Sequence, residues 1–138
     1  FFAENGSGAF MNDRRIRVSG RNQLQNSLLN TGINLDIENE YKAYMNEVSQ
    51  CIINRSEVRV SGCSALDLAW VAAGRTDGFW QRNLNPSECS AGIILVKEAG
   101  GFCTDFSMRD KAGLGIQVCA ANPNLHGNLI KFLHKVSN

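Results

Sequence analysis

Two segments of the sequence carry residues whose types and spacing could do chemistry. In the first, Gly62, Cys63 and Ser64 follow an alternating apolar segment and precede a run of apolar residues. This pattern is typical of a strand that turns into a helix, where the N–H groups of residues 63–65 can bind anions or hydroxyl groups. A tight turn followed by a capping box of Ser64 and Asp67 explains the same residues without a ligand. Both interpretations remain open on this segment alone.

The second segment is a polar stretch over residues 81–88 that precedes an apolar helical run. Gln81 ends a short predicted strand, and Glu88 falls in the first turn of the predicted helix. A carboxylate at this place is stabilised by the helix dipole, and it could also bind a cation. One carboxylate is a poor site for Mg²⁺, which requires about six oxygen ligands. The segment therefore predicts either helix-start electrostatics or one ligand of a larger metal site.

Composition limits the classes of protein to which the chain can belong. It has 138 residues, the length of one domain, with 43% hydrophobic and 20% charged residues and a net charge of +1. No apolar run approaches the roughly 20 residues of a membrane span. Five cysteines without a C-x-x-C pair argue against a zinc knuckle and favour a reducing, cytoplasmic compartment. The near-neutral charge gives no general electrostatic attraction for nucleic acid.

A nucleophile–base arrangement is a further hypothesis, with Cys63 or Ser64 beside one of the histidines. His126 and His134 both fall in the amphipathic C-terminal segment, on its predicted polar side. Scattered residues of this kind constrain no catalytic geometry. We expect surface histidines and a buried thiol instead.

The elements that must position these residues alternate between strands and helices. Apolar residues at helical spacing predict helices over 36–53, 64–73, 86–99 and 123–136. The first helix is expected to bury one stripe, formed by Ile37, Tyr41, Tyr44, Met45, Val48, Cys51 and Ile52. Strands are predicted over 16–19, 27–30, 57–61, 78–80, 102–106 and 116–120, with tight turns near 5–8 and 9–13. This order predicts an α/β layered domain with a parallel or mixed sheet.

Several ordered motifs resemble the inositol monophosphatase family, within the lithium-sensitive, Mg²⁺-dependent phosphatase superfamily. The opening Ala3–Asn12 is similar to the family's A-x-x-G-x-G-A-x-x-N turn, and Val60–Ala65 to its substrate segment. Residues 69–79 and 84–101 resemble its L-x-A-x-G-x-x-D and W-D-x-A-A-G…E-A-G-G segments. The similarity covers essentially the whole chain and fits a bacterial-type member.

The resemblance implies a layered α/β sandwich of which residues 1–138 are the C-terminal domain. The family's N-terminal half, which carries most metal ligands, has no counterpart here, and the chain opens without methionine inside an apparent element. The implied activity is Mg²⁺-dependent hydrolysis of inositol monophosphate or a similar polyol or sugar phosphate by a homodimer. No catalytic residue is expected in this half. The implied site consists of one metal ligand, Glu88, and the substrate-contacting Gly62, Cys63, Ser64 and Gln81.

Departures from the family pattern fall at this implied site. Glu88 replaces the family's metal-binding Asp, Ser87 replaces its Trp, and Gln81 replaces a Glu that contacts an inositol hydroxyl. Cys63 stands where Thr or Ser is usual, and Ser64 where Ala is usual. Backbone contacts would survive the last two changes, whereas Mg²⁺ tolerates little change in geometry.

The alternative function comes from a different class. Some bacterial members of the family resemble regulators that bind the transcription machinery independently of catalysis. Arg14, Arg15, Arg17 and Arg21 form a local basic cluster that would suit RNA or an acidic partner. A solvated hairpin face explains the same cluster.

Overall fold

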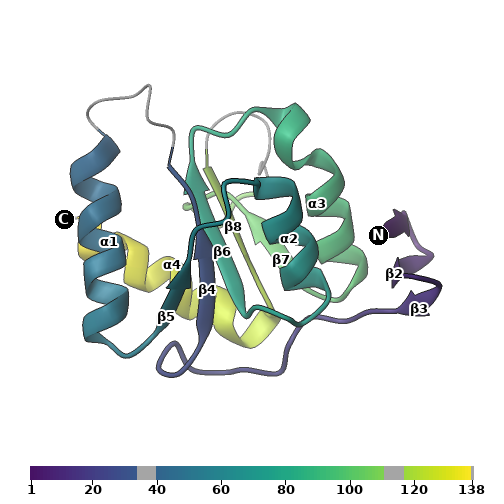
Figure 1. Ribbon diagram of the computed structural model, residues 1–138, viewed down its shortest axis with the longest axis horizontal. Helices are drawn as coiled ribbons and strands as arrows, with labels where there is room; N and C mark the ends of the chain where they lie inside the picture. Colours follow the sequence, from purple (N-terminus) through teal and green to yellow (C-terminus); the bar gives the residue numbers. More distant parts are fainter. Residues whose placement is uncertain (34–39, 111–116, 138) are drawn as a thin grey trace.

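The computed structural model describes residues 1–33, 40–110 and 117–137 (Figure 1). Its helices are α1 (Glu40–Ile53), α2 (Ser64–Ala72), α3 (Pro86–Glu98) and α4 (Pro123–Ser137). Its strands are β1 (Phe2–Glu4), β2 (Gly8–Met11), β3 (Arg14–Arg15), β4 (Leu28–Thr31), β5 (Glu57–Arg59), β6 (Gly78–Arg82), β7 (Phe102–Thr104) and β8 (Gln117–Ala121). Residues 36–39 of the predicted first helix and Ile116 of a predicted strand lie outside the described residues.

The central sheet has five strands in the order β5-β4-β6-β8-β7. Strands β5, β4 and β6 are parallel, whereas β8 is antiparallel to both β6 and β7. The predicted mixed sheet is therefore confirmed. The three parallel strands end at the same edge, so the loops that follow them meet there.

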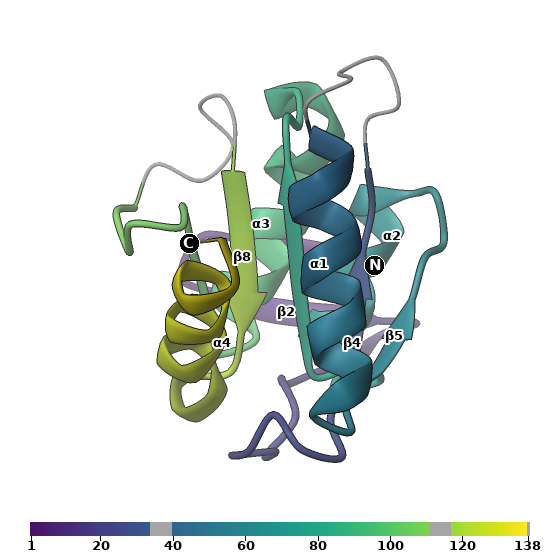
Figure 2. The same ribbon diagram turned by 90° about the vertical axis from the view of Figure 1, so that its left-hand side faces the viewer.

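Helices cover both faces of this sheet, with α2 and α3 on one side and α1 and α4 on the other (Figures 1 and 2). Side chains alternate between the faces along each strand. In β6, Phe79 packs under α2 and α3, and Trp80 packs under α1 and α4. Both are at most 1% exposed, and burying a side chain of this size stabilises the fold by about 1.5–3 kcal/mol. The layered α/β architecture predicted from the sequence is confirmed.

A small antiparallel sheet of β1, β2 and β3 packs outside α3 (Figure 1). The turn between β1 and β2 has positive φ at Gly6 (81°) and Gly8 (89°), which directs both N–H groups to one side. Both N–H groups donate to the carboxylate of Glu98 in the last turn of α3, with 3.1 Å between Gly8 N and Glu98 Oε2. The two glycines of the opening motif and the glutamate of the E-A-G-G segment thus form one contact.

Two local predictions for the N-terminal region are wrong. Residues 9–11 form strand β2, and the turn follows at Asn12 and Asp13, which both have positive φ. Residues 16–19 form no strand, although Ile16 N–H donates to Ala9 O and Val18 N–H donates to Ala99 O. The segment is held by single hydrogen bonds, one to β2 and one to the residue that follows α3. Its alternation of apolar and polar residues therefore arises from side-chain packing and not from pairing with a neighbouring strand.

The predicted buried stripe of α1 is also wrong in part. Tyr41, Met45 and Ile52 are 43%, 62% and 61% exposed, whereas Glu47 is fully buried. Glu47 accepts a hydrogen bond from Trp80 Nε1 at 2.8 Å and forms an ion pair with Arg82. These two partners in β6 allow a carboxylate to face the sheet. The inward face of α1 is therefore rotated relative to its apolar stripe.

Candidate functional site

A pocket of about 580 Å³ lies where β4, β5 and β6 end and α2 and α3 begin. This volume is in the range of small-molecule sites. We call it the strand-end pocket; all five residues singled out in the sequence line it. Its lining consists of Gly32, Ile33, Val60, Gly62, Cys63, Ser64, Asp67, Gln81, Asn83, Leu84, Asn85 and Glu88.

Gln81 reaches the pocket because Gly32 leaves room for it. A Cβ atom at position 32 would lie 2.5 Å from Gln81 Oε1 and 3.0 Å from Gln81 Cδ, closer than non-bonded contacts allow. Gln81 comes from β6 and Gly32 from the end of the neighbouring parallel strand β4. The missing side chain at position 32 therefore leaves room for the carboxamide where it lies. This packing partner was not predicted from the sequence.

Gly62 is required for its backbone angle, not for space. Its φ is +81°, a conformation that residues with a side chain rarely adopt, and nothing lies within 4 Å of its missing Cβ. Crowding therefore does not explain a glycine at this position. The open space beside it belongs to the mouth of the strand-end pocket.

The N-terminus of α2 differs from the predicted capping box. Cys63 is the N-cap residue, and its own N–H donates to Ser61 Oγ at 3.0 Å, so this N–H is not free for a ligand. The N–H groups of Ser64 and residue 65, in the first turn of α2, have no hydrogen-bond partner among the described residues. Ser64 Oγ donates to the carbonyl oxygen of Glu88 at 3.4 Å and links α2 to α3.

Asp67 lines the pocket but was predicted only as a cap. It is 1% exposed and accepts hydrogen bonds from Ser61 Oγ at 2.7 Å and from Asn30 Nδ2 at 3.2 Å. Burial raises the pKa of Asp67, and the bond from Ser61 partly opposes this shift. Asp67 therefore fixes the loop from β5 to α2. Its position four residues into an otherwise apolar helix was the one sequence signal for this role.

Glu88 lies in the first turn of α3, as predicted. Its Oε2 accepts a hydrogen bond from the Asn85 N–H at 3.2 Å, which is the glutamate half of a capping box. Its side chain is exposed at the pocket rim. Glu88 and Asp67 are the two carboxylates of the pocket lining, and Asp67 is already engaged by two donors. Among these residues, Glu88 is the carboxylate accessible to a cation.

The described residues do not complete a metal site. Across residues 1–33, 40–110 and 117–137, no group of three or more His, Cys, Asp or Glu side chains could hold a metal ion. An exposed carboxylate fits one position of a Mg²⁺ coordination shell, whose remaining oxygens would have to come from water, substrate or other residues. The residues present thus fit a partial Mg²⁺ site.

The nucleophile–base hypothesis is not supported by the placement of the residues. His126 is 1% exposed on α4, where its Nε2 lies 2.8 Å from Thr104 Oγ1 and its ring meets Phe102 edge-on. Cys63 is exposed, so the expectations of a surface His126 and a buried Cys63 thiol are both wrong. Neither histidine lines the strand-end pocket. Burial lowers the pKa of His126, which keeps it neutral.

The predicted basic cluster lies apart from this pocket. Arg14, Arg15, Arg17 and Arg21 are exposed, and the Arg15 guanidinium lies 6.0 Å from the centre of the Phe10 ring. Arg21 also approaches Asp77, with 3.8 Å between Nε and Oδ2. None of the four lines the strand-end pocket.

A profile described as the inositol monophosphatase family matches residues 1–138. The chain belongs to the inositol monophosphatase family. It is 36% identical over 135 residues to an inositol-1-monophosphatase of Caulobacter vibrioides, which covers 96% of this chain and 53% of that protein. It is 43% identical over 110 residues to the Nus factor SuhB of Pseudomonas aeruginosa, which covers 78% of this chain and 40% of that protein.

Solved structures agree with the family membership. The extragenic suppressor protein suhB of Bartonella henselae has a TM-score of 0.90 and 42% identity, over 96% of this chain and 51% of that one. The inositol monophosphatase of Anabaena has a TM-score of 0.88 and 38% identity, over 97% of this chain and 53% of that one. The chain thus spans about half the length of these relatives. The family-level similarity supports a phosphatase-like hydrolase fold.

Proposed function

We propose that the protein carrying this chain is a Mg²⁺-dependent phosphomonoester hydrolase that acts on inositol monophosphate or a similar small polyol or sugar phosphate. The observation that carries this proposal is the strand-end pocket, where Gly62, Cys63, Ser64, Gln81 and Glu88 converge. Relatives named inositol-1-monophosphatase support the reaction class.

In this proposal Glu88 holds one coordination position of Mg²⁺, and the bound ion would activate water and neutralise charge on the phosphoryl group. The Ser64 N–H and its neighbour in the first turn of α2 donate to oxygen atoms of the substrate. Gln81, whose carboxamide lies beside Gly32, donates to or accepts from an alcohol hydroxyl. Asp67 acts on the substrate only through the loop that it fixes.

We also propose that residues 1–138 are the C-terminal domain of a longer family member. The chain matches relatives over about half of their length. The described residues offer one accessible pocket carboxylate, whereas Mg²⁺ requires about six oxygen ligands. The remaining ligands would come from a preceding half.

Phosphate release tests the proposal. The full-length protein is expected to hydrolyse inositol monophosphate only with Mg²⁺, and the 138-residue chain alone is expected to be inactive. Because both samples are assayed under the same conditions, turnover by the isolated chain would contradict the half-site proposal. No Mg²⁺-dependent turnover of any polyol phosphate by the full-length protein would contradict the hydrolase proposal.

A regulator of transcription is the second candidate function. Relatives from Neisseria, Xylella and Pseudomonas are named Nus factor SuhB or putative Nus factor SuhB. The exposed Arg14, Arg15 and Arg17 offer a basic surface for RNA or an acidic protein. Binding of RNA or RNA polymerase factors that persists after Glu88→Gln but is lost when these arginines become glutamine would favour this function.

We further propose a cytoplasmic homodimer. Tyr41, Met45 and Ile52 expose an apolar face on α1 that a second copy would cover. The five cysteines are free, as expected in a reducing compartment. Within the described residues no helix is both long and apolar enough to cross a membrane. A monomeric mass by light scattering at micromolar concentration would contradict the dimer.

A further inference from the structure

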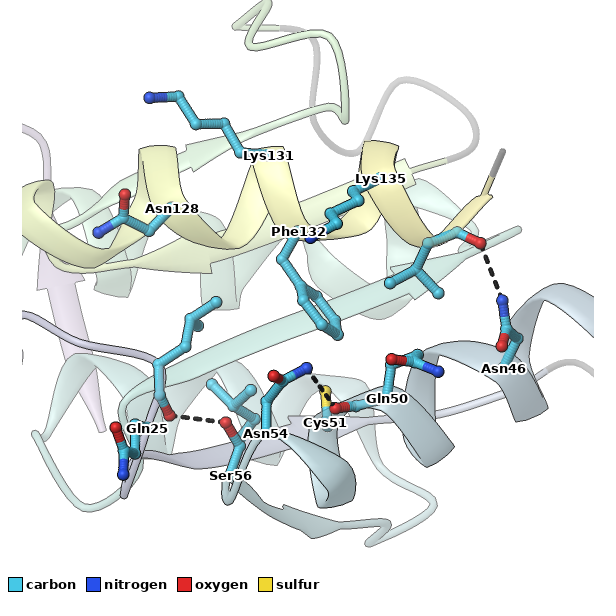
Figure 3. Close-up of a pocket in the computed structure, with 13 residues that line it drawn as sticks. Gln25, Asn46, Gln50, Cys51, Asn54, Ser56, Asn128, Lys131, Phe132 and Lys135 are labelled. Carbon is cyan, nitrogen blue, oxygen red and sulfur yellow. Dashed lines mark hydrogen bonds between the residues drawn. The ribbon is translucent and has the colours of Figure 1, made fainter.

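A second cavity lies on the opposite face of the sheet, between α1 and α4, with a volume of about 640 Å³ (Figure 3). We call it the α1–α4 cleft. Its ends are closed by two contacts. Asn46 Nδ2 donates to Val136 O at 2.8 Å, and Ser56 Oγ donates to Leu24 O at 2.6 Å. The cleft lies apart from the strand-end pocket, because no residue lines both.

The wall formed by α1 is polar where helices on a sheet usually meet through apolar side chains. Asn46, Gln50 and Asn54 follow one another at intervals of four residues, so they form one ridge along and just beyond α1. Asn54 Nδ2 donates to Gln50 O at 2.8 Å, which leaves the Asn54 Oδ1 and the Gln50 carboxamide available. This ridge forms the polar wall of the cleft.

The opposite wall combines an aromatic ring with positive charge. Phe132 points from α4 into the cleft, over a floor that includes Leu29 and Cys51, while Lys135 extends along the rim (Figure 3). Lys131, one turn earlier on α4, also lines the cleft, and its side chain extends away from Phe132 (Figure 3). Neither lysine has an ion-pair partner among the described residues, and the lining contains no Asp or Glu. The lining therefore has two positive charges in a protein whose net charge is +1.

These features together favour one class of ligand. An aromatic ring beside an apolar floor suits a flat ring system, which stacks on the aromatic face. Side-chain amides both donate and accept hydrogen bonds, as the edges of nucleobases require. Lysines without carboxylate partners suit phosphate. A sugar phosphate would leave the Phe132 face uncovered, and a basic or neutral peptide would leave both lysines unpaired.

We propose that the α1–α4 cleft binds a nucleotide, with its base against Phe132 and the Gln50–Asn54 ridge and its phosphate at Lys135. The nucleotide is either a free mononucleotide or the phosphorylated end of an RNA strand, since both present the same base and phosphate. The volume of the cleft accommodates a base, a ribose and one phosphate. This site is independent of the proposed phosphatase reaction.

Adenosine 5′-monophosphate titrated into ¹⁵N-labelled protein tests the proposal through side-chain amide signals in NMR spectra. The signals of Gln50, Asn54 and Asn128 are expected to shift, whereas those of Gln81 and Asn85 in the strand-end pocket stay in place. Adenosine and inorganic phosphate are each expected to bind at least about tenfold more weakly, because each lacks one half of the ligand. Shifts confined to Gln81 and Asn85, or equal binding of phosphate alone, would overturn the proposal.

Two variants separate the contributions. Lys135→Gln is expected to weaken the nucleotide by about tenfold, since a charge-assisted hydrogen bond is lost. Phe132→Leu keeps an apolar side chain but removes the stacking face, and about a fivefold or greater loss is expected. Lys42→Gln, an exposed lysine of α1 outside the cleft, is the matched control and should bind as the unaltered protein does. Unchanged affinity in both cleft variants would refute the assignment.

A 5′-phosphorylated oligoribonucleotide distinguishes the two sources. Tighter binding than that of the mononucleotide, with the same amide shifts, identifies a strand end, and weaker binding identifies the free nucleotide. Light scattering of Gln50→Arg checks for a different occupant. If this substitution converts a dimer into a monomer, the cleft is a protein interface and the nucleotide proposal fails.

Discussion

Replacing Glu88 separates the two roles that its position allows. In the structure its Oε2 accepts the Asn85 N–H at 3.2 Å in the first turn of α3. In Glu88→Gln the amide oxygen can still accept this bond, so the loss is the interaction of the charge with the helix dipole, about 0.3–1 kcal/mol. For a domain of this size, we expect Tm without metal to fall by about 1–4 °C.

The effect on metal is expected to be larger. If Glu88 is a Mg²⁺ ligand, its neutralisation should raise the half-saturating Mg²⁺ concentration for phosphate release by at least about tenfold, equivalent to 1.4 kcal/mol. Glu88→Asp places the shorter carboxylate of the family pattern at this position, and we expect it to keep or raise activity. Its shorter side chain should lose the bond to Asn85, with a similarly small fall in Tm.

The assay is a Mg²⁺ titration of phosphate release by the full-length protein and the two variants. Glu57→Gln serves as the matched control, because Glu57 is an exposed carboxylate outside the pocket that pairs with Arg59 at 3.1 Å. Superimposable titrations for all four proteins, with activity clearly present, would remove Glu88 from the metal site and leave only its capping role.

Three further predictions concern the pH dependence of stability, thiol reactivity and the position of Gln81. Because burial lowers the pKa of His126 below its usual 6.5, the unfolded chain takes up this proton first. The free energy of unfolding should therefore fall as pH drops below about 6.5, and it should fall less in His126→Gln. A free energy of unfolding, measured with urea, that stays constant from about pH 7.5 to 5.5 would contradict this prediction. A maleimide should modify Cys63 alone in the native protein, since the other four thiols are buried. Rapid modification of two or more thiols, measured by mass spectrometry, would contradict this prediction. Gly32→Ala would place a Cβ 2.5 Å from Gln81 Oε1 and so displace the Gln81 carboxamide. KM for the polyol phosphate should therefore rise severalfold, while Tm changes little. An unchanged KM would remove Gln81 from the substrate contacts.

The sequence predicts the layered α/β fold because periodicity and capping residues are local signals. The start of α3 at Pro86 and of α4 at Pro123 follow from proline at a first helical position, which needs no N–H donor. Loops after parallel strands then meet at one sheet edge, so the five candidate site residues gather there. Their roles with substrate and metal stay predictions.

The remaining features depend on partners distant in the sequence. Glu47 is buried because Trp80 and Arg82 lie opposite it, so the apolar stripe alone gives the wrong inward face for α1. His126 is buried because Thr104 offers a hydrogen bond. Asp67 enters the pocket lining through donors from two other segments. Single-residue patterns carry no information about such pairs.

Helix α3 connects the strand-end pocket with the β1–β2 hairpin. Its first turn carries Glu88 at the pocket rim, and its last turn carries Glu98, which is held by the N–H groups of Gly6 and Gly8. Ten residues of helix correspond to a stiff rod of about 15 Å. The β1–β2 hairpin therefore helps to hold the end of α3 that lies opposite the pocket. We expect a substitution in the hairpin turn to weaken this contact with Glu98 and thereby to change the position of α3 and of Glu88 at its other end. The geometry of the pocket would then depend in part on residues that do not line it.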